Sequence, residues 1–185
     1  MGQRGKTTGK SHSENLLHED RFNSVYQLIR SKRYSQALRK LLSERAGKLA
    51  EGFAEEPNHA WYVVGDLYFK KKELRIATSA FRRSIAADGS DAQAYLALGN
   101  CYLGLGEHRK ALKAYSQGLD ADPRDAKLRY NLGNAYFDLG KYGQAATLYR
   151  SVNRSRDETV RQRAAFNLKL ALSKLAGQST NRTSE

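Results

Sequence analysis

The feature that most constrains the fold of this chain is a 34-residue pattern that occurs three times in its middle. Each copy has a glycine, a tyrosine three residues later, and then an alanine and an aromatic residue at fixed spacings. The glycine and the tyrosine lie in the segments Trp61–Tyr68, Tyr95–Tyr102 and Arg129–Tyr136. A fixed period of this size is typical of a solenoid, in which each copy buries its apolar face against its neighbours.

Within each copy the apolar residues have helical spacing, which predicts two helices joined by a turn. The glycines are Gly65, Gly99 and Gly133, the alanines are Ala77, Ala111 and Ala145, and the aromatic residues are Phe81, Tyr115 and Tyr149. The glycine allows the two helices to approach closely, and the small alanine accommodates the aromatic side chain. We therefore expect these aromatic residues to pack in the core, together with Trp61, Tyr68, Tyr102 and Tyr136.

These residues resemble the tetratricopeptide repeat, whose pattern has the same residue types at the same spacings. The second copy matches most fully, with Tyr95, Leu98, Gly99, Tyr102, Gly106, Ala111, Tyr115, Leu119 and Pro123. The resemblance implies an all-α fold, an α-solenoid of stacked helix-turn-helix repeats at residues 58–91, 92–125 and 126–159. The layout also resembles that of small bacterial secretion chaperones, although no diagnostic motif of those proteins is present.

Helical segments and disordered tails are predicted on both sides of the three repeats. They are a disordered basic tail at 1–13, a helical hairpin with its link at 14–57, a capping helix at 160–175 and a disordered tail at 176–185. Within the hairpin we expect helices at 14–31 and 34–50. Its Ala37 lies 40 residues before Ala77, and Tyr34-Ser-Gln-Ala37 is similar to Tyr142-Gly-Gln-Ala145, so the hairpin is interpreted as a degenerate repeat.

The capping helix is expected to continue the 34-residue register, because Leu170 lies 34 residues after Tyr136. An open stack needs an end helix with a solvated outer face. We expect this helix to have that role.

In tetratricopeptide arrays the first helix of each repeat lines a concave groove. Residues two positions before the packed face point to the opposite side, since each helical residue turns by about 100°. The predicted groove residues are Tyr62, Asp66, Leu96, Asn100, Lys127, Tyr130, Asn131, Asn134 and Arg161. Because an amide both donates and accepts hydrogen bonds, the row formed by Asp66, Asn100 and Asn134 predicts contact with the backbone of a partner segment.

Some chaperone-binding members of this family hold a C-terminal carboxylate with a Lys-Asn-Asn-Lys-Arg set. Asn100 and Asn131 match its two asparagines, and Arg161 replaces its second basic residue. Leu96 and Ala165 occupy the positions of the first lysine and the arginine, so we do not expect a full clamp.

The net charge of +13 is concentrated at the two ends, with +7 on residues 1–50, −1 on 51–125 and +7 on 126–185. The basic residues include Arg30, Lys32, Arg33, Arg39 and Lys40 in the hairpin, and Arg154, Arg156 and Arg163 near the C-terminal helix. They are either solvated helix faces or a surface for RNA, an acidic protein or an anionic membrane. Any binding of nucleic acid would depend steeply on salt concentration.

No nucleophile is paired with a base, and the four histidines and one cysteine lack metal-ligand spacing. We therefore predict a non-enzymatic scaffold, adaptor or chaperone-like protein, without cofactor or metal, that binds a partner's peptide or helix in the groove. Two alternatives stay open: a nucleic-acid-associated factor that uses the basic ends, and a regulatory subunit of an enzyme complex. The single Cys101 and the lack of an apolar N-terminal stretch favour a cytoplasmic location.

Overall fold

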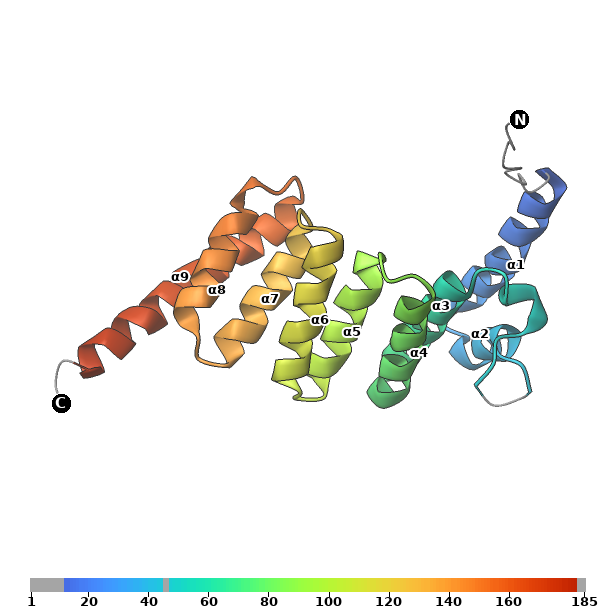
Figure 1. Cartoon of the computed structure of the whole chain (residues 1–185), viewed down its shortest axis with the longest axis horizontal. Coiled ribbons are helices and arrows are strands. Elements are labelled where there is room, and N and C mark those ends of the chain that lie inside the picture. The colour runs from blue at the N-terminus through green and yellow to red at the C-terminus, as the bar shows by residue number, and fades with distance from the viewer. Residues whose placement is uncertain (1–11, 45–46, 183–185) are drawn as a thin grey trace, which may run out of the picture. The chain divides into compact units, whose positions relative to one another are not determined.

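The computed structural model describes residues 12–44 and 47–182, which form the helices drawn in Figure 1. Residues 1–11 of the predicted N-terminal tail lie outside the described part. The chain divides into two units between Glu56 and Pro57. The predicted all-α fold class is confirmed. None of the helices in the two described ranges is both long and apolar enough to cross a membrane.

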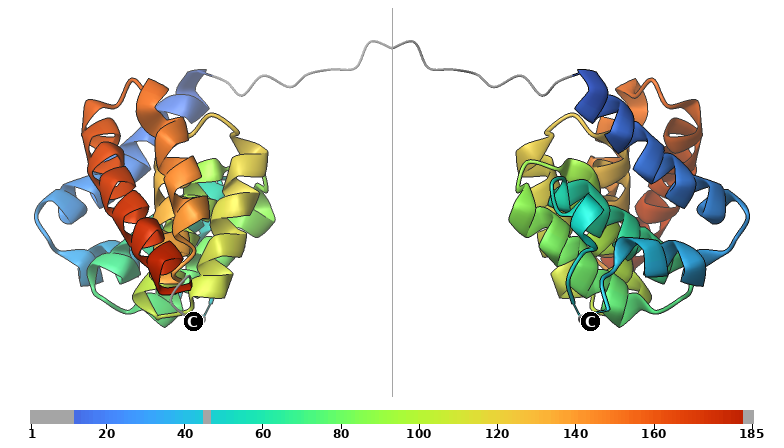
Figure 2. Two further views of the ribbon diagram at one scale, coloured as in Figure 1. Left: turned by 90° about the vertical axis from the view of Figure 1, so that its left-hand side faces the viewer. Right: turned by 90° about the vertical axis from the view of Figure 1, so that its right-hand side faces the viewer.

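The second unit consists of consecutive helices that pack side by side (Figures 1 and 2). They are α3 (Pro57–Lys70), α4 (Leu74–Ala87), α5 (Ala92–Gly104), α6 (His108–Ala121), α7 (Ala126–Asp138), α8 (Tyr142–Ser151), the 3₁₀ turn η2 (Val152–Arg154) and α9 (Glu158–Arg182). The pairs α3–α4, α5–α6 and α7–α8 are stacked helix-turn-helix repeats. The solenoid architecture is therefore confirmed.

In each repeat an aromatic side chain of the second helix lies directly against the glycine of the first. These aromatic residues are at most 2% exposed: Phe81, Tyr115 and Tyr149. A Cβ atom added to the facing glycine would lie 2.7, 2.3 or 2.7 Å from the ring at Gly65, Gly99 and Gly133. Those distances are well inside van der Waals contact, so glycine is required for the two helices to pack at this separation.

The first helices of successive repeats line one face of the second unit. Each of them contacts the next, from α3 to α5, α7 and α9, more extensively than the second helices contact one another. A stack that is tighter along one row of helices curves toward that row. Helices α3, α5, α7 and α9 therefore lie on its inner face.

Helix α9 takes the place of the first helix in a fourth repeat, but not in the expected register. Its buried residues Ala164 and Ala171 lie 36 residues after Leu128 and Ala135, the corresponding buried residues of α7. A 34-residue register would instead bury Phe166, which is 69% exposed. The predicted register is wrong because the chain gains two residues between the matching positions of α7 and α9.

Helix α9 is also longer than predicted, and its outer face is more apolar than the solvated face that was expected. It begins at Glu158 and ends at Arg182, so the predicted tail at 176–185 is wrong over residues 176–182. This stretch has no proline, and its leucines and alanines favour a helix. The outer face is not fully polar either, since it exposes Phe166, Leu170, Leu172 and Leu175.

The first unit contains α1 (His12–Arg30), α2 (Tyr34–Leu41) and a 3₁₀ turn, η1 (Glu51–Phe53). The predicted second helix at 34–50 is wrong beyond Leu41. There Leu42 and Leu49 pair in an isolated antiparallel bridge, and the backbone N–H of Ala50 donates to the carbonyl of Leu41. This closed loop satisfies backbone groups that a continued helix would have satisfied.

One turn conformation recurs in both units. A residue with positive φ ends the first helix of each pair, with φ of 57°, 65°, 73° and 70° at Lys32, Lys72, Gly106 and Gly140. The next residue then donates its backbone N–H to a carbonyl five residues earlier, as in a Schellman motif. Lys32 lies 40 residues before Lys72, which is the offset expected for a degenerate repeat in the hairpin.

Candidate partner-binding groove

Two asparagines of the predicted amide row accept hydrogen bonds from buried tyrosines. The hydroxyl of Tyr115 donates to Oδ1 of Asn100 at 2.7 Å, and the hydroxyl of Tyr149 donates to Oδ1 of Asn134 at 2.8 Å. Burial raises the pKa of both phenols above the usual value, so the hydroxyls stay protonated and able to donate. These tyrosines fix the orientation of the amides above them.

The first repeat lacks this pair. Its aromatic residue is Phe81, which has no hydroxyl, and the row position is Asp66, which forms an ion pair with Lys70. Tyr62 packs edge-on against Phe81, with ring centroids 5.6 Å apart. The inner face therefore offers amide groups in the second and third repeats and a carboxylate in the first.

A hollow of about 350 Å³ opens on the inner face between α5, α7 and α9. We call it the inner hollow; its lining residues are Leu103, Asn134, Phe137, Asp138, Tyr149, Asn167 and Leu170. Nδ2 of Asn167 donates to Oδ1 of Asn134 at 3.0 Å and to the hydroxyl of Tyr130 at 3.2 Å. The sequence prediction missed Asn167 and Leu170 as groove residues because it placed α9 two residues out of register.

Helix α9 exposes Phe166, whereas Tyr130 at the matching position of α7 is covered by the following helix. Tyr130 packs against Tyr149 of the following helix, with ring centroids 5.9 Å apart. Phe166 lies 36 residues after Tyr130, and no described helix follows α9 to cover it. Phe166 and the neighbouring Leu170 therefore add exposed apolar surface near the inner hollow.

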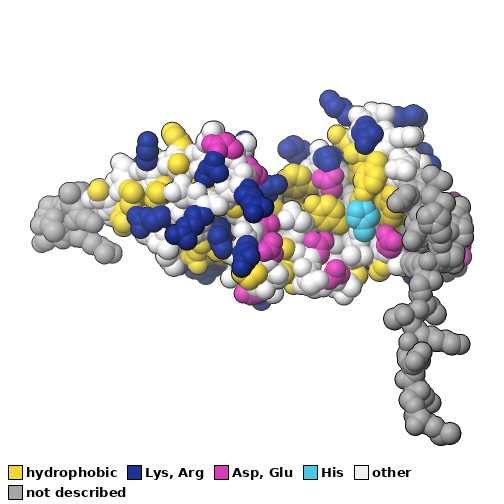
Figure 3. All heavy atoms as spheres, turned by 90° about the horizontal axis from the view of Figure 1, so that it is seen from above, with side chains coloured by type: hydrophobic (Ala, Val, Ile, Leu, Met, Phe, Trp, Pro, Cys, Tyr) yellow, Lys and Arg dark blue, Asp and Glu magenta, His cyan; other side chains and the backbone are white. Residues whose placement is uncertain are grey.

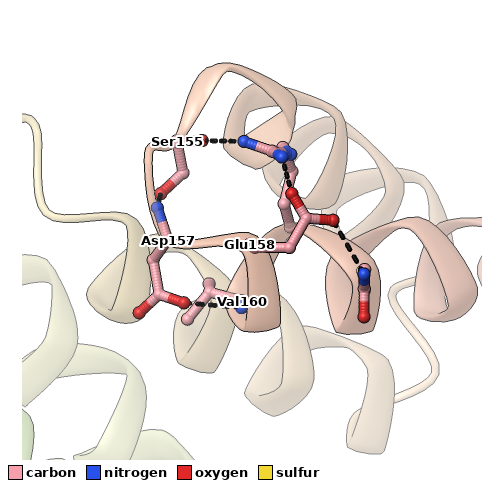
Figure 4. A network of polar contacts seen from close by, with 6 residues as sticks. Ser155, Asp157, Glu158 and Val160 are labelled. Atoms are coloured by element: carbon pink, nitrogen blue, oxygen red, sulfur yellow. Dashed lines mark hydrogen bonds and ion pairs between the residues drawn. The ribbon is translucent and has the colours of Figure 1, made fainter.

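Three other predicted groove residues are held by contacts within the second unit. Nδ2 of Asn131 donates to the carbonyl of Lys127 at 2.9 Å, and Leu96 is buried. Arg161 donates to the carbonyl of Ser155 at 2.6 Å and pairs with Glu158 (Figure 4). These contacts hold Arg161 at the start of α9, and the register shift removes its correspondence with the second basic residue of a carboxylate clamp.

A second hollow, of about 600 Å³, lies where α5, α7 and α9 begin. We call it the basic hollow; its lining residues are Gln93, Arg124, Asp125, Ala126, Lys127, Arg154, Ser155, Arg156 and Asp157. Both aspartates cap helices. Asp125 accepts from the backbone N–H of Leu128 at 2.9 Å. Asp157 accepts from that of Val160 at 3.1 Å, as Figure 4 shows.

An adjoining hollow of about 590 Å³ also contains Arg154 and is lined further by Arg129, Thr147, Arg150, Ser151 and Asn153. Figure 3, which views the molecule from above, shows Lys and Arg side chains gathered over the part of the second unit that α7 to α9 form. The fold thus brings the predicted Arg154 and Arg156 together with arginines of other segments.

The remaining predicted basic residues lie elsewhere. Arg163 is exposed on α9 and lines none of these hollows. The hairpin residues are exposed in the first unit: Arg30, Lys32, Arg33, Arg39 and Lys40.

Among the described residues, no group of three or more His, Cys, Asp or Glu side chains could hold a metal ion. Cys101 is buried, and burial raises the pKa of its thiol to about 12. A thiol with this pKa is almost entirely protonated at neutral pH, so Cys101 is a core residue rather than a nucleophile.

Several solved structures have a similar fold at low sequence identity. PcrH of Pseudomonas aeruginosa, solved in complex with the chaperone binding region of PopD, is 22% identical with a TM-score of 0.62, covering 68% of this chain and 98% of PcrH. The Yersinia enterocolitica type III secretion chaperone SycD, in complex with a peptide of the translocator YopD, is 16% identical with a TM-score of 0.59, covering 63% and 92%. MamA is 23% identical with a TM-score of 0.57, covering 88% and 81%. These likenesses show the fold alone.

No curated protein sequence matches the chain. The tetratricopeptide repeat model matches residues 62–108 and 96–158, which together span more than half of the chain. These residues include the three glycine–aromatic contacts that hold the helix pairs together. The chain therefore belongs to the tetratricopeptide repeat family.

Proposed function

We propose that the protein is a non-enzymatic, chaperone-like adaptor whose inner face binds an extended segment of a partner protein. The observation that carries this proposal is the inner hollow, in which Leu103, Phe137 and Leu170 surround the amides of Asn134 and Asn167. Apolar walls around oriented polar groups are typical of sites that hold a peptide side chain and its backbone together.

The tyrosine–asparagine pairs supply a mechanism for backbone recognition. Oδ1 of Asn134 accepts from both Tyr149 and Asn167, whereas its Nδ2 has no partner among the described residues. Asn100 is oriented in the same way by Tyr115. The free N–H groups can therefore donate to carbonyls of a bound segment, whatever its side chains are.

The structural relatives support this proposal by analogy. PcrH and SycD have the same fold, and their structures contain segments of PopD and YopD, respectively. The groove of this chain is built from the same kind of repeat. We propose that it has the same general use, with a partner of its own.

A second candidate function is binding of nucleic acid, favoured by the arginines of the basic hollow. No aromatic side chain lines this hollow or the adjoining one, so neither offers a surface on which bases could stack. We therefore place groove binding first. A role as regulatory subunit of an enzyme complex stays a prediction.

The test is affinity capture from a lysate of the source organism, with three baits compared side by side. Leu170→Ser removes an apolar wall of the inner hollow. Ile76→Ser is the matched control, since Ile76 on α4 is 47% exposed, Leu170 is 41% exposed, and Ile76 lines none of the three hollows. Asn100 and Asn134 are poorer targets, because removing them would leave buried tyrosine hydroxyls unpaired and lower stability.

The proposal predicts a protein retained by wild type and by Ile76→Ser and depleted on Leu170→Ser. Equal retention by all three baits would contradict it. Capture that nuclease treatment abolishes would instead favour the nucleic-acid candidate.

A further inference from the structure

The inner hollow and the basic hollow lie on the same helices, but at opposite ends of them. Helix α7 contributes Lys127 to the basic hollow and Phe137 to the inner hollow, and α5 contributes Gln93 and Leu103 in the same way. The two hollows are therefore connected by the length of α5 and α7, along which one bound segment could reach both.

The basic end carries positive charge that the chain does not neutralise. In the described part of the molecule, no ion pair involves Arg124, Lys127, Arg154 or Arg156. The two aspartates that line this end are directed at helix N-termini, where they accept backbone N–H groups.

The other end has the opposite character. Asp138 is the charged residue in the lining of the inner hollow, and the surrounding side chains are apolar or neutral. An acidic group of a partner is thus attracted to the basic end and repelled from the inner hollow.

We propose that the bound segment combines an apolar residue in the inner hollow with an acidic residue in the basic hollow. This inference rests on the proposed function and specifies its ligand. From Lys127 to Phe137, α7 rises by about 15 Å at about 1.5 Å per residue. An extended segment covers that distance in about four or five residues, and arginines hold a carboxylate through paired hydrogen bonds.

The spacing and the charge together fix the line along which the segment lies, with its acidic residue at the basic hollow. An acidic residue four or five positions from the apolar one reaches the arginines only if the segment runs along α7 from one hollow to the other. A phosphate backbone, in contrast, would use the basic hollow and leave the inner hollow empty.

The experiment selects random displayed peptides on the full chain and then titrates fluorescent synthetic copies of those enriched. Leu170→Ser tests the inner hollow, and the double variant Arg154→Glu/Arg156→Glu tests the basic hollow. The control double variant Arg109→Glu/Lys113→Glu changes the net charge equally, at exposed positions of α6 outside the three hollows. A fluorescent single-stranded oligonucleotide is titrated in parallel.

The inference predicts enriched peptides with an acidic and an apolar residue about four or five positions apart. Their affinity should fall about tenfold or more in Leu170→Ser and in the Arg154/Arg156 variant, and change little in the control. Replacing the acidic residue of the peptide by its amide should weaken wild-type binding and have little effect on the Arg154/Arg156 variant.

Two results would overturn the inference while leaving the proposed function intact. One is a set of peptides that require Leu170 but carry no acidic residue. The other is an oligonucleotide that needs Arg154 and Arg156 when the peptides do not, which would assign the basic hollow to nucleic acid. If no enriched peptide depends on Leu170, the proposed function and the inference fail together.

Discussion

Helices α7 and α9 bury the same positions against the second helix of the preceding repeat, which is α6 for α7 and α8 for α9. They differ on the side that a following helix would cover. Leu128 and Ala135 in α7, and Ala164 and Ala171 in α9, are all at most 1% exposed. The two helices therefore share one packing scheme, 36 residues apart. Figure 2 shows α9 lying beside α8 at the C-terminal end of the second unit.

The other side of the two helices shows what a complete repeat adds. In α7, Gly133 and Tyr130 meet the ring of Tyr149, whereas in α9 the corresponding Lys169 and Phe166 are exposed. Packing against the preceding repeat is enough to place a helix, but a helix of its own is needed to cover its apolar face. Helix α9 therefore closes the stack and keeps apolar surface available near the groove.

The largest expected effect comes from removing the ring that covers α7. Tyr149→Ala should lower the free energy of unfolding by about 3–5 kcal/mol, because a fully packed aromatic leaves a cavity. Phe166→Ala should change it by less than about 0.5 kcal/mol, since the ring is mostly exposed. Urea denaturation of both variants measures the difference, and equal costs would show that α7 and α9 do not differ in this way.

The glycine position gives a second comparison of the same helices. In Gly133→Ala the new Cβ would lie 2.7 Å from the ring of Tyr149, so we expect a loss of about 1–3 kcal/mol from overpacking. Lys169→Ala, at the matching position of α9, should have almost no effect on stability. A Gly133→Ala protein as stable as wild type would mean that the close approach of α7 and α8 is not required.

A smaller effect should follow from removing one hydroxyl. Tyr149→Phe deletes the hydrogen bond to Asn134 and should cost about 1 kcal/mol, leaving this repeat like the first, which has Phe81. Tyr142→Phe is the control, because no hydrogen bond of its hydroxyl occurs among the described residues. Thermal unfolding monitored by circular dichroism measures both, and equal shifts in the two variants would contradict the role of the tyrosine–asparagine pair.

The smallest expected effect concerns the turns. Lys72 has a φ of 65° where the next two repeats have Gly106 and Gly140. Because this conformation costs a side-chain-bearing residue about 1–2 kcal/mol, and glycine loses more entropy on folding, Lys72→Gly should stabilise by a few tenths to about 1 kcal/mol. The reverse change, Gly106→Lys, should destabilise, and a destabilised Lys72→Gly protein would contradict the account of the turn.

The stacked fold could be predicted from the sequence because the packing positions recur at a fixed period. Gly65, Gly99 and Gly133 lie 34 residues apart, and each packs against an aromatic residue 16 positions later. The register of α9 could not be predicted in the same way. Its offset changes before the helix, and the buried Ala164 and Ala171 are too small and too common to reveal it.

The groove was predicted less completely than the fold. Helical spacing predicts that Asn100 and Asn134 lie on the groove. It does not predict that Tyr115 and Tyr149 donate to them, because those contacts depend on how two helices cross. The sequence nevertheless carries a signal for these hydrogen bonds. The amide row has asparagine in the two repeats whose facing aromatic residue is tyrosine, and Asp66 in the repeat whose facing residue is Phe81. The basic hollow unites Arg124 and Arg154 from separate connections, and no local pattern shows that they meet.

The most direct test of groove binding is photo-crosslinking from two positions in the source organism. A photoreactive amino acid replaces Leu170 in one protein and Ile76 in another, and the crosslinked partners are identified by mass spectrometry. We expect one partner to be crosslinked from position 170 and not from position 76, through a segment with an apolar residue near an acidic one. Crosslinks from position 76 alone, or equally from both, would contradict binding in the inner groove.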